Sequence, residues 1–218
     1  MADRYAVIGN PVEHSKSPWI HAEFARATGQ QIEYGRIEAP LDAFARTVDE
    51  FRAAGGRGAN VTLPFKEQAY RCCASLSARA RAARVVNTLR FDGAAIFGDN
   101  TDGAGLLRDL GVNLGRPLAG RQVLLMGAGG AAQGVLAPLA RAGAARVVIA
   151  NRTVGKAVAL AARFPDAPLE ACGYDALAGE SFDLVINATS AGLEGASPPL
   201  PAGLFRSGAL AYDMVYGR

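Results

Sequence analysis

The chain has 218 residues, 50% of them apolar and 20% charged, which is the composition of a folded globular protein and not of a disordered one. Its 23 lysines and arginines against 20 aspartates and glutamates leave a net charge of +3, too weak to indicate a nucleic-acid partner. No apolar run approaches the roughly 20 residues that a membrane-spanning helix needs. The first residues lack the basic and then apolar profile of a signal peptide, so we expect a cytoplasmic protein without a membrane partner.

The cysteines and histidines do not have the spacing of a metal site. Cys72 and Cys73 are adjacent, Cys172 lies far along the chain, and only His14 and His21 could supply imidazole ligands. Zinc sites draw on closely spaced pairs of these residues. We therefore expect no metal cofactor and three reduced thiols.

Short apolar runs alternate with helical segments along the chain, which indicates βαβ units and mainly parallel sheets. The predicted strands cover residues 5–9, 32–37, 58–63, 85–91, 94–98, 121–126, 146–150, 183–187 and 209–213. The predicted helices cover residues 18–28, 41–54, 65–72, 75–83, 102–110, 130–142 and 153–163. Asp92-Gly93 lies between two strand-like runs and predicts one tight hairpin.

A turn-rich stretch at residues 111–117 separates the strands into two sets. We place a first domain at residues 1–101 and a second at residues 102–218, with the helix after Asp102 as the connector. The predicted fold class is therefore α/β, with two α/β domains and a mainly parallel sheet in the first. Clefts between domains are common ligand sites.

A glycine-rich turn follows the strand predicted at residues 121–126. Gly127, Gly129 and Ala132 have the G-x-G-x-x-A spacing between that strand and the next helix. In a Rossmann domain the first glycine permits the tight turn, the second lets backbone approach a pyrophosphate, and the third position allows close helix packing. Free N–H groups at the start of the helix favour an anion. The second domain is thus predicted to bind a dinucleotide.

The next strand ends at Asn151, Arg152 and Thr153, where binders of NAD place a carboxylate against the ribose 2′-hydroxyl. This chain has Arg152 there, with Lys156 one turn later. Cations at this point suit a 2′-phosphate, so NADP is the predicted cofactor. Alternatively, Arg152 is a solvated cation and Thr153 only caps the helix.

Polar residues follow the first strand. Pro18 favours extended backbone at Ser17, so Ser15 and Ser17 would project to one side and could hold a small anion such as a carboxylate. The alternative is that Ser17 caps the helix with Pro18 in its first turn, which leaves Ser15 without a role.

Lys66 follows a predicted strand and Pro64, which places it in the first turn of a helix. The helix dipole disfavours a cation there, and a local rule broken at the carboxyl end of a strand indicates function. Asp102 is an ordinary helix-capping residue but could also face Lys66 from the connector helix. Asn87 is predicted inside a strand, where asparagine is disfavoured, so either a hydrogen-bond network or a ligand would account for it.

Together these motifs resemble the shikimate dehydrogenase family, in the same order along nearly the whole chain. The matching segments are Ile8-Gly9-Asn10-Pro11, His14-Ser15-Lys16-Ser17-Pro18, Asn60-Val61-Thr62-Leu63-Pro64-Phe65-Lys66, Val86-Asn87-Thr88, Gly98-Asp99-Asn100-Thr101-Asp102-Gly103, Gly127 to Ala132, Asn151-Arg152-Thr153, Asn187-Ala188-Thr189-Ser190 and Asp213-Met214-Val215-Tyr216.

The resemblance implies an NADP-linked reduction of 3-dehydroshikimate to shikimate, on the route to chorismate and the aromatic amino acids. It implies a catalytic pair, Lys66 and Asp102. It implies further substrate contacts from Ser15, Ser17, Thr62, Asn87 and Tyr216. It implies an NADP site made by Gly127, Ala128, Gly129, Gly130, Ala131, Asn151, Arg152, Thr153, Lys156 and Met214.

The resemblance also leaves alternatives. Family members continue beyond the tyrosine motif with a segment that supplies a substrate-binding glutamine, which has no counterpart here, so we expect a chain that binds NADP and turns over slowly. The rival functions are a quinate/shikimate dehydrogenase with relaxed specificity and a non-catalytic NADP-binding protein. We expect a monomer or a homodimer.

Overall fold

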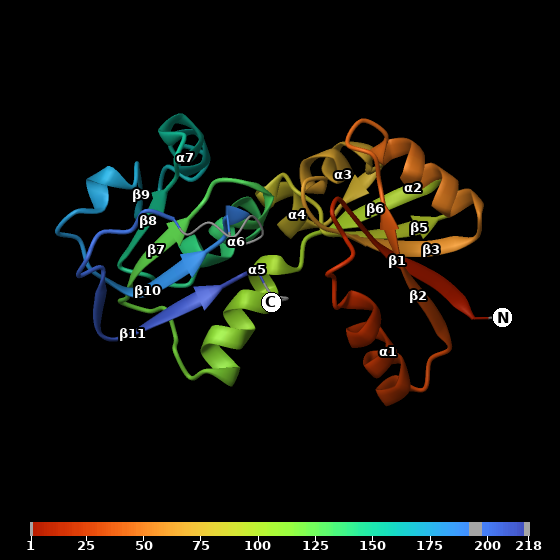
Figure 1. The fold of residues 1–218 in the computed structure, drawn as a ribbon, viewed down its shortest axis with the longest axis horizontal. Helices are drawn as coiled ribbons and strands as arrows, with labels where there is room; N and C mark the ends of the chain where they lie inside the picture. The colour runs from red at the N-terminus through yellow and green to blue at the C-terminus, as the bar shows by residue number, and fades with distance from the viewer. Residues whose placement is uncertain (1, 192–197, 216–218) are drawn as a thin grey trace. The chain divides into compact units, whose positions relative to one another are not determined.

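A computed structural model describes residues 2–191 and 198–215 (Figure 1). The chain divides into two compact units, one ending at Thr101 and the other beginning at Asp102. Each unit is an α/β layer structure built on its own sheet. The predicted α/β fold class is therefore confirmed.

The first unit is a six-stranded sheet with the strand order β2-β1-β3-β5-β6-β4. In chain order its elements are β1 (Asp3–Gly9), α1 (Ser17–Thr28), β2 (Ile32–Glu38), α2 (Phe44–Ala53), β3 (Gly56–Val61), α3 (Lys66–Cys72), β4 (Ser75–Leu76), α4 (Ala78–Ala83), β5 (Thr88–Asp92) and β6 (Ala95–Asp99). β1 pairs in parallel with β2 and β3, and β4 with β6, whereas β5 is antiparallel to both of its neighbours. The predicted hairpin joins β5 and β6 through Gly93, whose φ is +61°.

Apolar packing fixes the carboxyl ends of β1 and β3 in this unit. The fully buried rings of Phe44 and Phe65 stack with centroids 4.9 Å apart, so the starts of α2 and α3 are held together. A Cβ atom on Gly9 would lie 2.4 Å from the side chain of Thr62. Glycine thus allows the end of β1 to approach the segment that carries Thr62.

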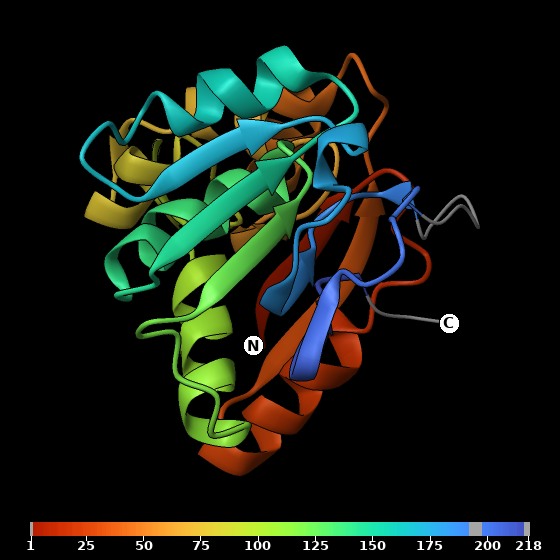
Figure 2. The same ribbon diagram turned by 90° about the vertical axis from the view of Figure 1, so that its left-hand side faces the viewer.

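The second unit has a five-stranded sheet, entirely parallel, with the order β11-β10-β7-β8-β9 (Figure 2). Its elements are α5 (Asp102–Arg108), a π-helical turn η1 (Asp109–Asn113), β7 (Gln122–Met126), α6 (Gly130–Arg141), β8 (Arg146–Ala150), α7 (Val154–Ala161), β9 (Leu169–Cys172), the 3₁₀ turn η2 (Asp175–Leu177), β10 (Phe182–Asn187) and β11 (Phe205–Asp213). The strand order reverses between β7 and β10, which is where open parallel sheets bind ligands.

Both faces of β7 are buried. Val123 and Leu125 belong to one apolar cluster, whereas Leu124 and Met126 belong to another. A strand covered on both faces gives a continuous apolar run instead of an alternating one. This explains why residues 123–126 form an uninterrupted apolar run in the sequence.

Several predicted boundaries were wrong. Residues 75–83 were predicted as one helix but begin with the short strand β4, and β9 was not predicted at all. The strand predicted at residues 85–91 begins only at Thr88. Val85 and Val86 are fully buried, so their apolar character reflects core packing and not membership of the sheet ladder.

Among the helices of the described residues, none has both the length and the apolar character needed to cross a membrane. The described part of the chain also holds no group of three or more metal-ligating side chains.

Asp99, the last residue of β6, is held by a cation and two other donors. Arg79 donates to it at 2.7 Å from Nε, and Ser77 Oγ and the Asn100 N–H donate as well. The hydrogen bonds from Arg79 outweigh the opposing effect of burial, and with the other two donors they lower the pKa of Asp99 from 3.8 to about 2. Asp99 therefore stabilises the fold when it is ionised.

We expect Asp99→Asn to lower the free energy of unfolding at neutral pH by about 1–2 kcal/mol. A group with a depressed folded-state pKa contributes its full stability above the unfolded-state pKa, so the difference should shrink as the pH falls from 4 towards 2. Urea unfolding of both proteins at pH 7, 5 and 3 measures this. Asp92→Asn is the control, because it changes an exposed carboxylate paired with Arg90, and it should have little effect. A loss of unfolding free energy in Asp99→Asn that does not depend on pH would contradict the prediction.

Candidate functional site

The glycine turn begins where β7 ends. Gly127 has φ +106°, and a Cβ atom there would lie 3.0 Å from the carbonyl oxygen of Ala188, so this position requires glycine. Gly129 occupies the N-cap position of α6, no side chain caps that helix, and the space beside Gly129 is open. The first-turn N–H groups of α6, starting at Gly130, are therefore available to an anion.

The alanines of this segment serve packing. Ala128 is buried, Ala131 packs against the apolar core, and Ala132 lies completely buried in the first turn of α6. Their small side chains let α6 lie close to the sheet. The turn thus fits a pyrophosphate, with backbone as the ligand.

The end of β8 carries the predicted cofactor cations. Asn151 donates from Nδ2 to the carbonyl oxygen of Thr153 at 2.9 Å and fixes the turn. Thr153 is the N-cap residue of α7, as the alternative predicted, but its side chain makes no cap hydrogen bond. Arg152 and Lys156 are exposed on this turn and on the first turn of α7.

Arg152 lies in an environment that suits a phosphate. No carboxylate of the described residues forms an ion pair with it. Burial raises the pKa of Tyr174, and the charge of Arg152 opposes that rise, which places the guanidinium within electrostatic reach of the ring after β9. The sequence analysis missed Tyr174, because β9, the strand that precedes it, was not predicted.

Met214 follows β11 beside a polar cluster. Asn187 Nδ2 donates to Asp213 Oδ2 at 3.1 Å, and Asn187 Oδ1 accepts from Thr189 Oγ1 at 2.7 Å. The N–H of Met214 donates to the carbonyl oxygen of Asn187 at 3.0 Å. The ends of β10 and β11 are thus joined next to the glycine turn, whereas Tyr216 lies outside the described residues.

In the first unit, the structure brings Ser15 and Ser17 together. Ser15 is 6% exposed, and its Oγ donates to Ser17 Oγ at 3.1 Å. Arg36 donates to the carbonyl oxygen of Ser15 from Nε and Nη2, at 3.0 and 2.6 Å. Ser17 is the first residue of α1 and Lys16 is the N-cap, without a side-chain cap. The alternative that Ser17 caps the helix is therefore wrong.

Thr62, Lys66 and Asn87 gather at the carboxyl end of β3. The N–H of Val61 donates to the carbonyl oxygen of Asn87 at 2.8 Å, and the N–H of Val86 donates to that of Lys66 at 2.9 Å. Lys66 is the first residue of α3, which confirms the prediction that it lies in the first turn of a helix. Asn87 was predicted inside a strand, but it lies in a bend before β5 and is not part of the sheet.

Asp102 begins α5 in the second unit and is half-buried. The prediction that it starts a helix is confirmed. Its expected partnership with Lys66 concerns residues of two different units, and it stays a prediction.

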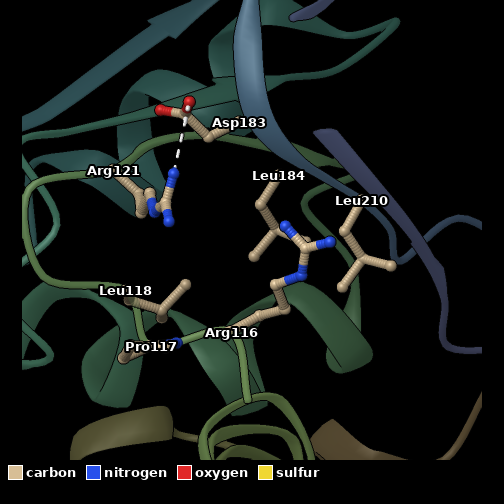
Figure 3. A pocket seen from close by; sticks show the side chains of 7 residues that line it. All are labelled: Arg116, Pro117, Leu118, Arg121, Asp183, Leu184 and Leu210. Atoms are coloured by element: carbon tan, nitrogen blue, oxygen red, sulfur yellow. Dashed lines mark ion pairs between the residues drawn. The ribbon is translucent and has the colours of Figure 1, made fainter. Parts of the chain in front are cut away.

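A small pocket lies near the amino ends of β7 and β10, the ends opposite the glycine turn (Figure 3). Asp183, near the start of β10, pairs with Arg121 at 3.8 Å and with Arg206 at 3.2 Å, and it also accepts from the N–H of Gln122 at 2.8 Å. The side chain of Arg116 extends towards Leu184 and Leu210. The Asp183 carboxylate already has these partners, so its role here is to link the starts of β7 and β10.

Two family models match the chain. The shikimate dehydrogenase substrate binding domain matches residues 7–89, and the shikimate / quinate 5-dehydrogenase model matches residues 110–194. The shikimate dehydrogenase (NADP(+)) of Methylobacillus flagellatus is 60% identical over 99% of this chain and 81% of its own length. This chain belongs to the shikimate dehydrogenase family.

Other shikimate dehydrogenases are also similar to this chain over nearly its whole length. The NADP(+) enzyme of Aromatoleum aromaticum is 59% identical over 99% of this chain and 78% of its own length. The crystal structure of shikimate 5-dehydrogenase from Thermus thermophilus, in complex with NADP(H) and shikimate, has a TM-score of 0.85 at 39% identity and covers 99% of this chain and 79% of that chain. The predicted family, oxidoreductase class and cofactor type are therefore confirmed.

Proposed function

We propose that this chain catalyses the reversible NADPH-linked reduction of 3-dehydroshikimate to shikimate, a step towards chorismate and the aromatic amino acids. The observation that carries the proposal is the glycine turn of β7 with Arg152 at the end of β8, in a chain whose first unit gathers hydroxyl, amide and ammonium groups beside β3. The first groups suit a phosphorylated dinucleotide, and the second suit a small polyhydroxylated acid.

The first unit is assigned to the substrate. Ser15 and Ser17 present two adjacent hydroxyls, which suit the two oxygens of a carboxylate. Thr62 and Asn87 offer a hydroxyl and an amide beside Lys66, which suit the ring hydroxyls. Tyr216 is assigned to the same substrate from the resemblance of its motif.

The second unit is assigned to NADP. Gly127 to Ala131 would hold the pyrophosphate through backbone N–H groups, and Asn151, Thr153 and Met214 would line the rest of the site. Arg152 and Lys156 would bind the 2′-phosphate by charge-assisted hydrogen bonds. The bound cofactor supplies a hydride to the carbonyl carbon.

Lys66 and Asp102 are assigned the proton chemistry. The carbonyl oxygen gains negative charge as the carbon is reduced, and the ammonium of Lys66 would donate a proton to it. The carboxylate of Asp102 would orient the hydroxyl beside the reacting carbon. General acid–base assistance of this kind contributes about 10²–10⁴-fold in rate. We also infer that the protein acts in the cytoplasm, since the related chains are bacterial biosynthetic enzymes. The expectation of a monomer or homodimer stays a prediction.

The experiment that tests this function follows the absorbance of the reduced nicotinamide with shikimate and either NADP or NAD. We expect shikimate-dependent reduction of NADP at a much higher kcat/KM than of NAD. Quinate in place of shikimate measures the breadth of specificity. Binding of NADP without any shikimate-dependent absorbance change would overturn the proposal in favour of a non-catalytic NADP-binding protein.

A further inference from the structure

The hydroxyl of Thr88, the first residue of β5, lies between two amides. Asn60 Nδ2 donates to Thr88 Oγ1 at 3.3 Å, and Thr88 Oγ1 donates to Asn87 Oδ1 at 2.8 Å. A hydroxyl has a single proton. Because Thr88 already accepts from Asn60, that proton is directed to the oxygen of the Asn87 amide.

The orientation of Asn60 is fixed from the other side. Tyr34 donates from its hydroxyl to Asn60 Oδ1 at 2.6 Å, so the NH₂ group of Asn60 faces Thr88. The Tyr34 ring stacks on His21, with centroids 4.1 Å apart and an interplanar angle of 16°. His21 Nδ1 lies 2.9 Å from the carbonyl oxygen of Ser17. The contacts therefore run from Ser17 through His21, Tyr34 and Asn60 to Thr88.

The amide of Asn87 is held in one orientation. Its Oδ1 accepts from Thr88 and from the N–H of Thr101 at 3.0 Å, while its Nδ2 donates to Thr101 Oγ1 at 2.9 Å. A flipped amide would set its NH₂ group against two donors. Half-buried networks with every member satisfied select one arrangement.

We propose that Thr88 is a positioning residue, whose hydroxyl orients the Asn87 amide towards the substrate. This inference rests on the proposed function, in which Asn87 contacts a ring hydroxyl. Thr88 itself does not have to touch the substrate. Its contribution reaches the reaction through Asn87, so its loss should affect substrate binding and leave cofactor binding unchanged.

Thr88→Val removes the hydroxyl and keeps the branched shape that suits a strand. We expect KM for shikimate to rise about tenfold, the effect of one lost hydrogen bond to substrate, with KM for NADP unchanged. Thr88→Ser should restore the wild-type KM. Thr88→Ala is a second hydroxyl-free variant, and thermal unfolding checks that each variant is folded. Thr47→Val, in α2, removes another half-buried hydroxyl with a hydrogen bond of 3.0 Å and should leave both constants unchanged.

The double variant with Asn87→Ala separates positioning from general damage. If Thr88 acts through Asn87, Thr88→Val should add no further rise in KM when Asn87 is already alanine. Additive effects, or an unchanged KM in the folded Thr88→Val and Thr88→Ala variants, would overturn the inference. A wild-type chain without shikimate-dependent activity would overturn the proposed function instead. If Asn87→Ala leaves KM for shikimate unchanged, Asn87 has no role in substrate binding and this inference is overturned as well.

Discussion

Replacing Lys66 with methionine is expected to lower turnover by about 10²–10⁴-fold, because the reacting oxygen loses the group that donates its proton in reduction and accepts it in oxidation. The methionine side chain has a similar length and no charge, so the packing at the start of α3 is largely kept. KM for shikimate should change much less than kcat, since the proton is transferred only in the chemical step and not when shikimate binds. Steady-state kinetics with shikimate and NADP measure both constants.

The control for this prediction is Arg71→Met, which removes an exposed cation from the last turn of the same helix. It should retain wild-type turnover, because a surface charge at that end of α3 has no part in the proposed chemistry. A turnover of Lys66→Met within about twofold of wild type would rule out the general-acid role. A large loss in Arg71→Met as well would assign the effect to the stability of α3.

Replacing Arg152 with alanine is expected to raise KM for NADP by about 10–100-fold and to leave KM for NAD unchanged. Charge-assisted hydrogen bonds to a phosphate contribute about 1.5–3 kcal/mol to binding. NAD has no 2′-phosphate, so its binding does not depend on these hydrogen bonds. The relevant measurement is the ratio of kcat/KM for the two cofactors. Arg152→Asp should lower the ratio of kcat/KM for NADP to that for NAD still further, because a carboxylate repels the 2′-phosphate and can accept a hydrogen bond from a ribose hydroxyl.

Arg141→Ala is the matched control, because Arg141 is an exposed cation in the last turn of α6. It changes the net charge of the chain by the same amount as Arg152→Ala. Both variants should therefore respond equally to any general electrostatic attraction of the cofactor. An equal rise in KM for NADP in both would show that Arg152 has no specific contact with the 2′-phosphate.

Features that depend on near neighbours could be predicted from the sequence. The strand, glycine turn and helix around Gly127, the hairpin at Gly93 and the start of α3 at Lys66 all match the structure. Each is set by backbone conformation or by hydrogen bonds within a few residues. The alternation of strands and helices likewise predicted parallel sheets, because a parallel connection needs a crossover segment.

Predictions based on apolar character alone were less accurate. Val85 and Val86 suggested a strand that would include Asn87, yet the strand begins at Thr88. Buried valines occur in any segment that crosses a core, so hydrophobicity does not distinguish a strand of a sheet from a buried bend. Only the pairing partners decide, and those lie elsewhere in the chain.

The local sequence by itself determined the two α/β units, the glycine turn and the cation that follows β8, because those features arise from short-range backbone geometry and residue chemistry. Only the tertiary structure decided which polar side chains meet. Asn60 lies 26 residues from Tyr34 and 28 from Thr88, and the three come together because β2, β3 and β5 belong to one sheet. A hydrogen bond between distant residues depends on strand order and register, which no local pattern in the chain specifies.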